Sequence, residues 1–163
     1  MTRSGDMRTL RVGIIVYSHT GHTLTVAERL KERLSEIGHR VTLERLETVG
    51  PVSLGADRAE LRTKPFVGGY DALVLGSPVR GGRMSAPMRS YLEQVPSLEA
   101  KKIACLVTGV FPAGWGRNQT LAEMEGACKS KGAEVCGSGS VGWFSLRRNK
   151  KISRVVDRLS KVF

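Results

Sequence analysis

The sequence predicts an α/β fold, a single doubly wound five-stranded parallel sheet with helices on both faces. Short apolar runs of strand length alternate along the chain with longer segments of helical periodicity. The main apolar runs are continuous, which is typical of strands covered on both faces. The 163 residues, 40% of them hydrophobic, suffice for one core. We therefore expect one domain over residues 10–163, preceded by a flexible leader over residues 1–9.

The first half of the chain contains three segments with clear patterns. The apolar run 10–17 predicts a central strand, and apolar residues at helical spacing predict a helix over residues 23–37. Residues 41–46 alternate and carry charge, which favours an edge strand. Residues 47–70 have no sustained pattern, and we expect only a short helix over residues 57–63 there.

The second half alternates strands and helices again. Residues 71–76 predict a buried strand that breaks at Ser77-Pro78, and residues 102–109 predict the fourth strand. The glycine-rich segment 134–143 is expected to form the fifth strand. The helices that follow these strands are expected around residues 87–95, 121–128 and 152–162.

Three loops of unusual composition each follow a predicted strand, at residues 18–23, 77–83 and 109–116. In a doubly wound sheet, ligands bind outside the carboxyl ends of the strands, where the strand order reverses. We therefore expect these three loops to converge on one crevice.

The first loop is a candidate phosphate site. It follows a strand, opens a helix and contains three aliphatic hydroxyls but no acidic residue. It lacks the Gly-Lys-Ser/Thr ending of a Walker A loop, the GxGxxG fingerprint and the cysteine of a phosphatase loop. The alternative is that Ser18 and Thr20 only cap the helix. The loop with its leading tyrosine reads Tyr17-Ser18-His19-Thr20-Gly21-His22-Thr23.

The other two loops have the residues expected around a flat ring. Gly81 and Gly82 allow a ligand to approach the backbone, unless they only form a mobile turn. Phe111 and Trp115 lie in a loop of otherwise small residues and can stack on a planar group, unless they pack over a helix.

The chain resembles the flavodoxin-like family in its short-chain, FMN-binding form. Residues 17–23, followed by Val26-Ala27, resemble the phosphate loop (Ser/Thr)-x-Thr-Gly-x-Thr, and residues 70–79 with Gly81, Gly82 and Pro87-Met88 resemble the second flavin loop. The resemblance implies the strand order 2-1-3-4-5 and non-covalent FMN. Its phosphate would be held by Ser18, His19, Thr20, Gly21, His22 and Thr23, and its isoalloxazine flanked by Pro78, Val79, Arg80, Gly81, Gly82, Gly109, Phe111, Gly114 and Trp115. No catalytic side chain and no metal site are expected.

The chain departs from the family in three ways. His22 stands where asparagine is frequent, and we expect it to gain charge beside a phosphate. Arg80 replaces an aromatic residue in the flavin loop. Electron-shuttle flavodoxins are acidic, whereas this chain has a net charge of +11. Arg80, Arg83 and Arg117 are therefore expected to stabilise the anionic reduced flavin and to favour two-electron behaviour.

The resemblance implies an FMN-binding redox protein that carries electrons to or from a partner. An NAD(P)H-dependent quinone reductase and a flavin-free binding or regulatory module are the alternatives. Three cysteines without a CxxC pair, and no secretory signal or membrane-length apolar run, favour a reduced, cytoplasmic location. The basic cluster 147–151 has no interleaved aromatic residue, so it is interpreted as a solvated helix start and not as a nucleic-acid site. Both a monomer and a homodimer remain open.

Overall fold

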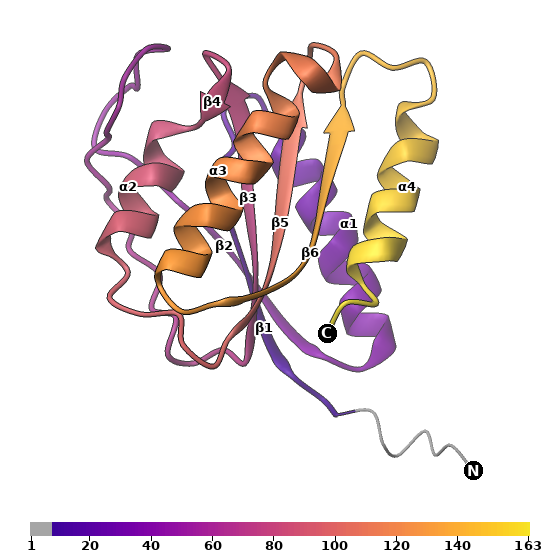
Figure 1. The fold of residues 1–163 in the computed structure, drawn as a ribbon. Coiled ribbons are helices and arrows are strands. Elements are labelled where there is room, and N and C mark those ends of the chain that lie inside the picture. The colour runs from indigo at the N-terminus through magenta and orange to yellow at the C-terminus, as the bar shows by residue number, and fades with distance from the viewer. Residues whose placement is uncertain (1–7) are drawn as a thin grey trace.

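The computed structural model describes residues 8–163, so most of the predicted leader lies outside the described residues. Figure 1 shows the order of strands and helices. The strands are β1 (Arg11–Val16), β2 (Arg40–Arg45), β3 (Ala72–Arg80), β4 (Arg83–Met84), β5 (Lys102–Gly109) and β6 (Glu134–Gly142). The helices are α1 (His22–Ile37), α2 (Ala86–Gln94), α3 (Arg117–Ser130), α4 (Arg148–Leu159) and the short 3-10 helix η2 (Ala113–Trp115). Within residues 8–163, no helix is both long and apolar enough to cross a membrane.

The sheet has the predicted topology. Its five long strands run parallel in the order β2-β1-β3-β5-β6, and β4 is a two-residue addition that pairs antiparallel with β3. Without β4, this order is 2-1-3-4-5, as predicted. The order reverses between β1 and β3, so the crevice expected for a ligand lies at their carboxyl ends.

The sheet is covered on both faces. Helices α1 and α4 pack on one face, and α2 and α3 cover the other together with the segment that joins β2 to β3 (Figure 1). The central strand β1 contributes to both cores, because Val12, Ile14 and Val16 point towards α1 and α4, whereas Ile15 points towards the opposite face. This double burial explains why the strand lacks polar alternation.

The short helix expected over residues 57–63 does not form. The chain instead returns on itself as a loop, with an isolated antiparallel bridge between Thr48 and Leu61. The N–H groups of Val49 and Arg62 donate to the carbonyls of Glu60 and Glu47, at 3.0 and 2.7 Å. Pairing across this loop satisfies backbone groups that a helix would have paired locally.

The third strand also extends beyond its predicted end. β3 continues through Ser77 and Pro78 to Arg80, and Pro78 lies opposite Thr108 of β5. Proline is compatible with extended backbone, although it lacks an N–H group to donate. On its other side, the end of β3 pairs with β4, and the N–H of Ser85 donates to Ser77 Oγ at 3.0 Å. The predicted break is therefore a hairpin.

Candidate functional site

The three loops predicted from the sequence meet at the carboxyl edge of the sheet, the upper edge in Figure 1. Thr23 at the end of the first loop hydrogen-bonds through its hydroxyl to Thr108 of β5, at 2.8 Å. A Cβ on Gly116 would lie 2.8 Å from Cγ1 of Val79 and 3.2 Å from Cα of Gly82, so the second and third loops are in contact there. This edge therefore brings together segments that are distant in the sequence.

The first loop presents unpaired donors at the start of α1. Gly21 precedes the helix with a φ of 92°, in the left-handed region. The N–H groups of residues 19–23 have no acceptor among residues 8–163, as expected for the first turn of a helix. The Ser18 hydroxyl accepts from the N–H of Leu24 at 3.3 Å, while Thr20 remains exposed. The loop is therefore suited to an anion.

The two histidines of the first loop have different surroundings. His19 is exposed, whereas the imidazole of His22 stacks on the indole of Trp143, with centroids 4.1 Å apart and an interplanar angle of 14°. The guanidinium of Arg148 lies over the same indole, 4.8 Å from its centroid. Partial burial, and then the charge of Arg148, lower the pKa of His22. The imidazole therefore favours its neutral form here, and its expected charge beside a bound phosphate stays a prediction.

The second loop is a tight hairpin. Gly81 and Gly82 form its two-residue turn between β3 and β4, with φ values of 61° and 78°. Two successive positive φ angles are the requirement of a type I′ turn, which explains the pair of glycines. No atom lies within 4 Å of a Cβ placed on Gly82. Backbone groups of this turn are therefore open to an approaching ligand.

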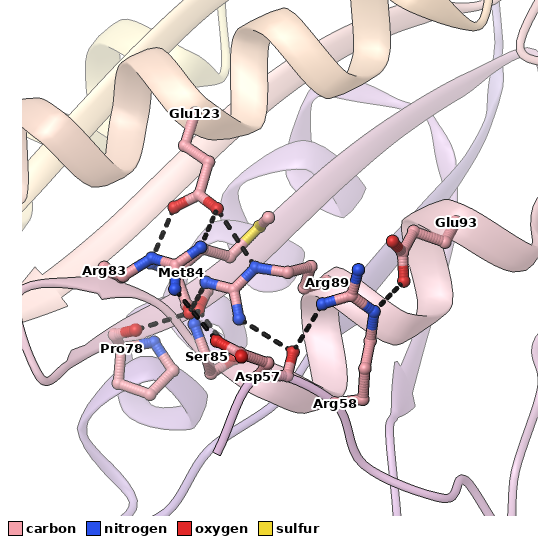
Figure 2. A network of polar contacts seen from close by, with 10 residues as sticks. Asp57, Arg58, Pro78, Arg83, Met84, Ser85, Arg89, Glu93 and Glu123 are labelled. Carbon is pink, nitrogen blue, oxygen red and sulfur yellow. Dashed lines mark hydrogen bonds and ion pairs between the residues drawn. The ribbon is translucent and has the colours of Figure 1, made fainter. Parts of the chain in front are cut away.

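A network of charged side chains and backbone carbonyls connects this hairpin to α2 and α3 (Figure 2). The buried guanidinium of Arg89 on α2 donates to Oε2 of Glu123 on α3 at 3.1 Å, and to the carbonyls of Met84 and Asp57 at 2.7 and 2.9 Å. The N–H of Met84 donates to the other Glu123 oxygen at 3.1 Å. Arg83 pairs with the Asp57 carboxylate at 3.1 Å and with Glu123 at 3.6 Å.

This network changes the expected electrostatics. Of the three arginines predicted to face a flavin, Arg83 is paired with carboxylates. Arg117 is half-buried, donates to Oγ of Ser140 at 2.9 Å, and has a pKa lowered by burial. Arg80 makes no ion pair within residues 8–163 and has one long hydrogen bond to the carbonyl of Val52, at 3.4 Å. Arg80 and Arg117 are thus the two of these arginines that make no ion pair within residues 8–163.

The aromatic side chains of the third loop are exposed to solvent. Phe111 and Trp115 are 60% and 69% exposed, with ring centroids 6.1 Å apart. The loop backbone is held by Gln119, whose side chain accepts from the N–H of Gly116 and donates to the carbonyl of Gly114, both at 3.0 Å. The last residue of β5, Gly109, contacts Arg117 and Val79 closely. Neither aromatic ring packs in the core, so both are accessible to a planar ligand.

Comparison with known proteins agrees with this arrangement. A family model described as a flavodoxin domain matches residues 13–136, about three quarters of the chain. The chain belongs to this family.

Solved structures of flavodoxins share the fold of this flavodoxin domain. Oxidised Flavodoxin 2 from Bacillus cereus has a TM-score of 0.68 and 22% identity, over 94% of this chain and 99% of that one. A flavoprotein from Lactobacillus acidophilus NCFM, solved in complex with FMN, has a TM-score of 0.65 and 19% identity, over 90% and 99% of the two chains. At these identities, the likeness concerns the fold alone.

A sequence relative has a named activity. An NAD(P)H dehydrogenase (quinone) from Paracoccus denitrificans (strain Pd 1222) is 27% identical over 120 residues, which are 66% of this chain and 58% of the relative. The chain thus spans less than two thirds of that relative's length.

Sequence reasoning missed four side chains that shape the site of this flavodoxin domain: Thr108, Trp143, Arg89 and Glu123. Thr108 and Trp143 stand at or just beyond the ends of β5 and β6, so the rule that placed the three loops at one edge could have found both. Arg89 and Glu123 lie within amphipathic helices, where a charged residue ordinarily indicates a solvated face. No local pattern marks them as partners.

Proposed function

We propose that this flavodoxin domain binds FMN non-covalently at the carboxyl edge of its sheet and carries electrons to or from a redox partner. The observation that carries the proposal is the meeting of three loops at that edge: a helix N-terminus with free donors, an open Gly-Gly hairpin and two exposed aromatic rings. The structure solved with FMN from Lactobacillus acidophilus supports the choice of ligand.

The phosphate end of the ligand fits the first loop. The N–H groups of residues 19–23 and the hydroxyls of Ser18 and Thr20 would surround a phosphate without a nearby carboxylate to repel it. The hydroxyl of Thr23 is engaged with Thr108, so it would orient the loop and leave phosphate binding to the backbone. His22, stacked on Trp143, would contribute its backbone N–H.

The ring end of the ligand fits between the second and third loops. The hairpin from Pro78 to Gly82 would offer backbone groups to the ring heteroatoms, and Trp115 or Phe111 would cover a ring face and exclude water. Bound flavin supplies reversible electron and hydride transfer, while the chain supplies position and charge. Arg80 would favour the anionic reduced form by Coulomb attraction.

The test is a titration of the purified protein with FMN and with riboflavin, followed by flavin fluorescence and the visible spectrum. We expect FMN to bind far more tightly than riboflavin, because only FMN has the phosphate. Thr20→Glu should abolish this preference by charge repulsion, whereas Ser35→Glu on the exposed distal part of α1 should not. A colourless protein that does not respond to FMN would contradict the proposal and support a flavin-free binding module.

A second candidate is an NAD(P)H-dependent quinone reductase, which the Paracoccus denitrificans relative favours. The same flavin site would accept hydride from the nicotinamide and reduce a quinone. The test adds NADH or NADPH anaerobically to the FMN-loaded protein and follows the flavin absorbance. Rapid bleaching, reversed by a soluble quinone, is the result expected of a reductase. An unchanged flavin band would exclude this candidate and leave the electron-carrier proposal standing.

A further inference from the structure

Exposed apolar side chains gather at the edge of the sheet that carries the three loops. Within residues 8–163, eight large hydrophobic side chains are exposed, and five of them follow β5 or β6. These five are Val110, Phe111, Trp115, Phe144 and Leu146. Scattered single apolar residues need no explanation, but a cluster at one edge indicates a contact surface.

Phe144 and Leu146 have no place in the proposed flavin site. They lie in the β6–α4 turn (residues 143–147), which rises beside η2 at the same edge of the molecule in Figure 1. Phe144 is 77% exposed and Leu146 fully exposed. The two side chains therefore project from a convex turn and do not line a groove.

The turn has an ordered support. Trp143 at its base is buried between the His22 imidazole and the Arg148 guanidinium. The N–H of Trp143 donates to the carbonyl of Gly109 at 2.8 Å, and the N–H of Arg148 donates to that of Ser145 at 3.1 Å. The exposed apolar tip is therefore presented on a fixed base and is not a frayed segment.

The turn is followed by a strongly basic segment at the start of α4. Between Glu134 and Asp157 the chain has five basic residues and no acidic residue. Arg147, Lys150 and Lys151 are exposed and form no ion pair with any residue in 8–163. The opposite side of α4 is apolar and buried in the core, so these cations face outwards. Apolar tips beside uncompensated cations are the combination that binds the interface of an anionic bilayer.

We propose that this edge docks on a membrane surface that contains anionic lipids. Phe144 and Leu146 enter the headgroup region, and the cations at the start of α4 contact lipid phosphates. A protein partner would need a pocket for both apolar tips, whereas a bilayer interface accepts any convex apolar turn. Nucleic acid would leave the aliphatic Leu146 without a stacking partner. The proposal does not depend on flavin binding.

The test is cosedimentation with phosphatidylcholine vesicles, with and without phosphatidylglycerol. We expect binding to the anionic vesicles alone. Phe144→Ser/Leu146→Ser should weaken binding about tenfold or more, through lost apolar burial. Lys150→Gln/Lys151→Gln should weaken it about fivefold per charge removed.

Matched controls remove similar groups from other surfaces. Phe66→Ser removes a 78% exposed aromatic ring from the segment between β2 and β3, and Lys31→Gln/Lys129→Gln removes two exposed cations from α1 and α3. Circular dichroism of every variant verifies folding. The control variants should bind anionic vesicles within about twofold of the wild type, since they lie outside the docking edge.

Four results would overturn the proposal. The first two are no binding to anionic vesicles and equal binding to neutral ones. The third is equal weakening in control and test variants. The fourth is a dimer, measured by light scattering, that Phe144→Ser/Leu146→Ser dissociates without changing vesicle binding, because the apolar tips would then join two copies of the chain.

Discussion

The first loop and the β3–β4 hairpin lie side by side at the same edge of the sheet, but different interactions hold them. The first loop is anchored by hydrogen bonds between neutral groups. The N–H of Tyr17 donates to the carbonyl of Gly76 at 3.1 Å, and the hydroxyls of Thr23 and Thr108 form a hydrogen bond of 2.8 Å. The hairpin is anchored by the charged side chains of Arg83, Arg89 and Glu123.

The difference in anchoring affects the electrostatic field that each loop can offer to a ligand. Neutral anchors leave the helix N-terminus uncompensated, so its field is free to act on an anion. The turn of the hairpin instead consists of two glycines without side chains. Beside the packing of Met84 in the core, the ionic network connects the hairpin to α2 and α3. Removing one partner of such an ionic network lowers the stability strongly, because it leaves a buried charge unpaired. Substitutions in the two anchors test this contrast.

Arg89→Met should lower the free energy of unfolding by about 4 kcal/mol, because it leaves Glu123 and two carbonyls without their buried donor. Urea denaturation measures the loss. Arg33→Met is the control, since the Arg33 ion pairs are exposed and 3.9 Å long, and it should cost about 0.5 kcal/mol or less. Similar losses in the two variants would show that the network does not hold the hairpin.

Gly116→Ala should destabilise the protein by about 2–3 kcal/mol, because it combines a positive φ with overlap against Val79 and Gly82. Gly82→Ala adds only the conformational cost, about 1 kcal/mol, because its Cβ enters open space. Urea denaturation of both variants gives their free energies of unfolding, and the difference between the two losses measures the contact between the second and third loops. Equal losses would mean that the Gly116 contact relaxes at no cost.

Thr23→Val should lower the free energy of unfolding by about 1–2 kcal/mol, because the buried Thr108 hydroxyl loses its partner. The double variant Thr23→Val/Thr108→Val should recover part of this loss, because no polar atom of the pair then remains unpaired. Both are measured by urea denaturation as a double-mutant cycle. Strictly additive losses would contradict coupling of the first loop to β5 through this bond.

The smallest effect concerns pH. The pKa of His22 lies below its ordinary value of 6.5, so the unfolded chain binds the proton more tightly than the folded one. Wild-type stability should therefore fall, relative to His22→Phe, as the pH drops from 6.5 towards the lowered pKa, and the difference should be constant above 6.5. Thermal unfolding over this range measures it. Inorganic phosphate should reduce the difference, because a bound anion favours the imidazolium.

A stability difference between wild type and His22→Phe that does not change with pH would contradict this account of His22. Phenylalanine is the appropriate replacement, because it keeps an aromatic ring against Trp143 and removes only the titrating group.

Much of the fold was predictable because its patterns are local. The run Lys102–Gly109 was predicted with the bounds that β5 has, since charge and glycine flank a continuous apolar segment. The predictions failed where distant partners decide the backbone. Residues 60–63 pair with residues 47–49, so the helix expected over residues 57–63 does not form. The strand β3 continues past Ser77 because β4 and β5 both pair with its end. The proposed ligand residues stay a prediction.

The strand-helix alternation, the family and the three loops that follow strands could be predicted from the sequence alone. These features depend on periodicity, turn chemistry and motifs that span a few residues. The stacking of His22 on Trp143 and the pairing of Arg89 with Glu123 beside the hairpin could be seen only in the folded chain. Such pairs join distant parts of the chain, and each depends on the packing that sets the positions of both backbones. The charge of a side chain is visible in the sequence, but its partner, and therefore its effect on the site, follows from the fold.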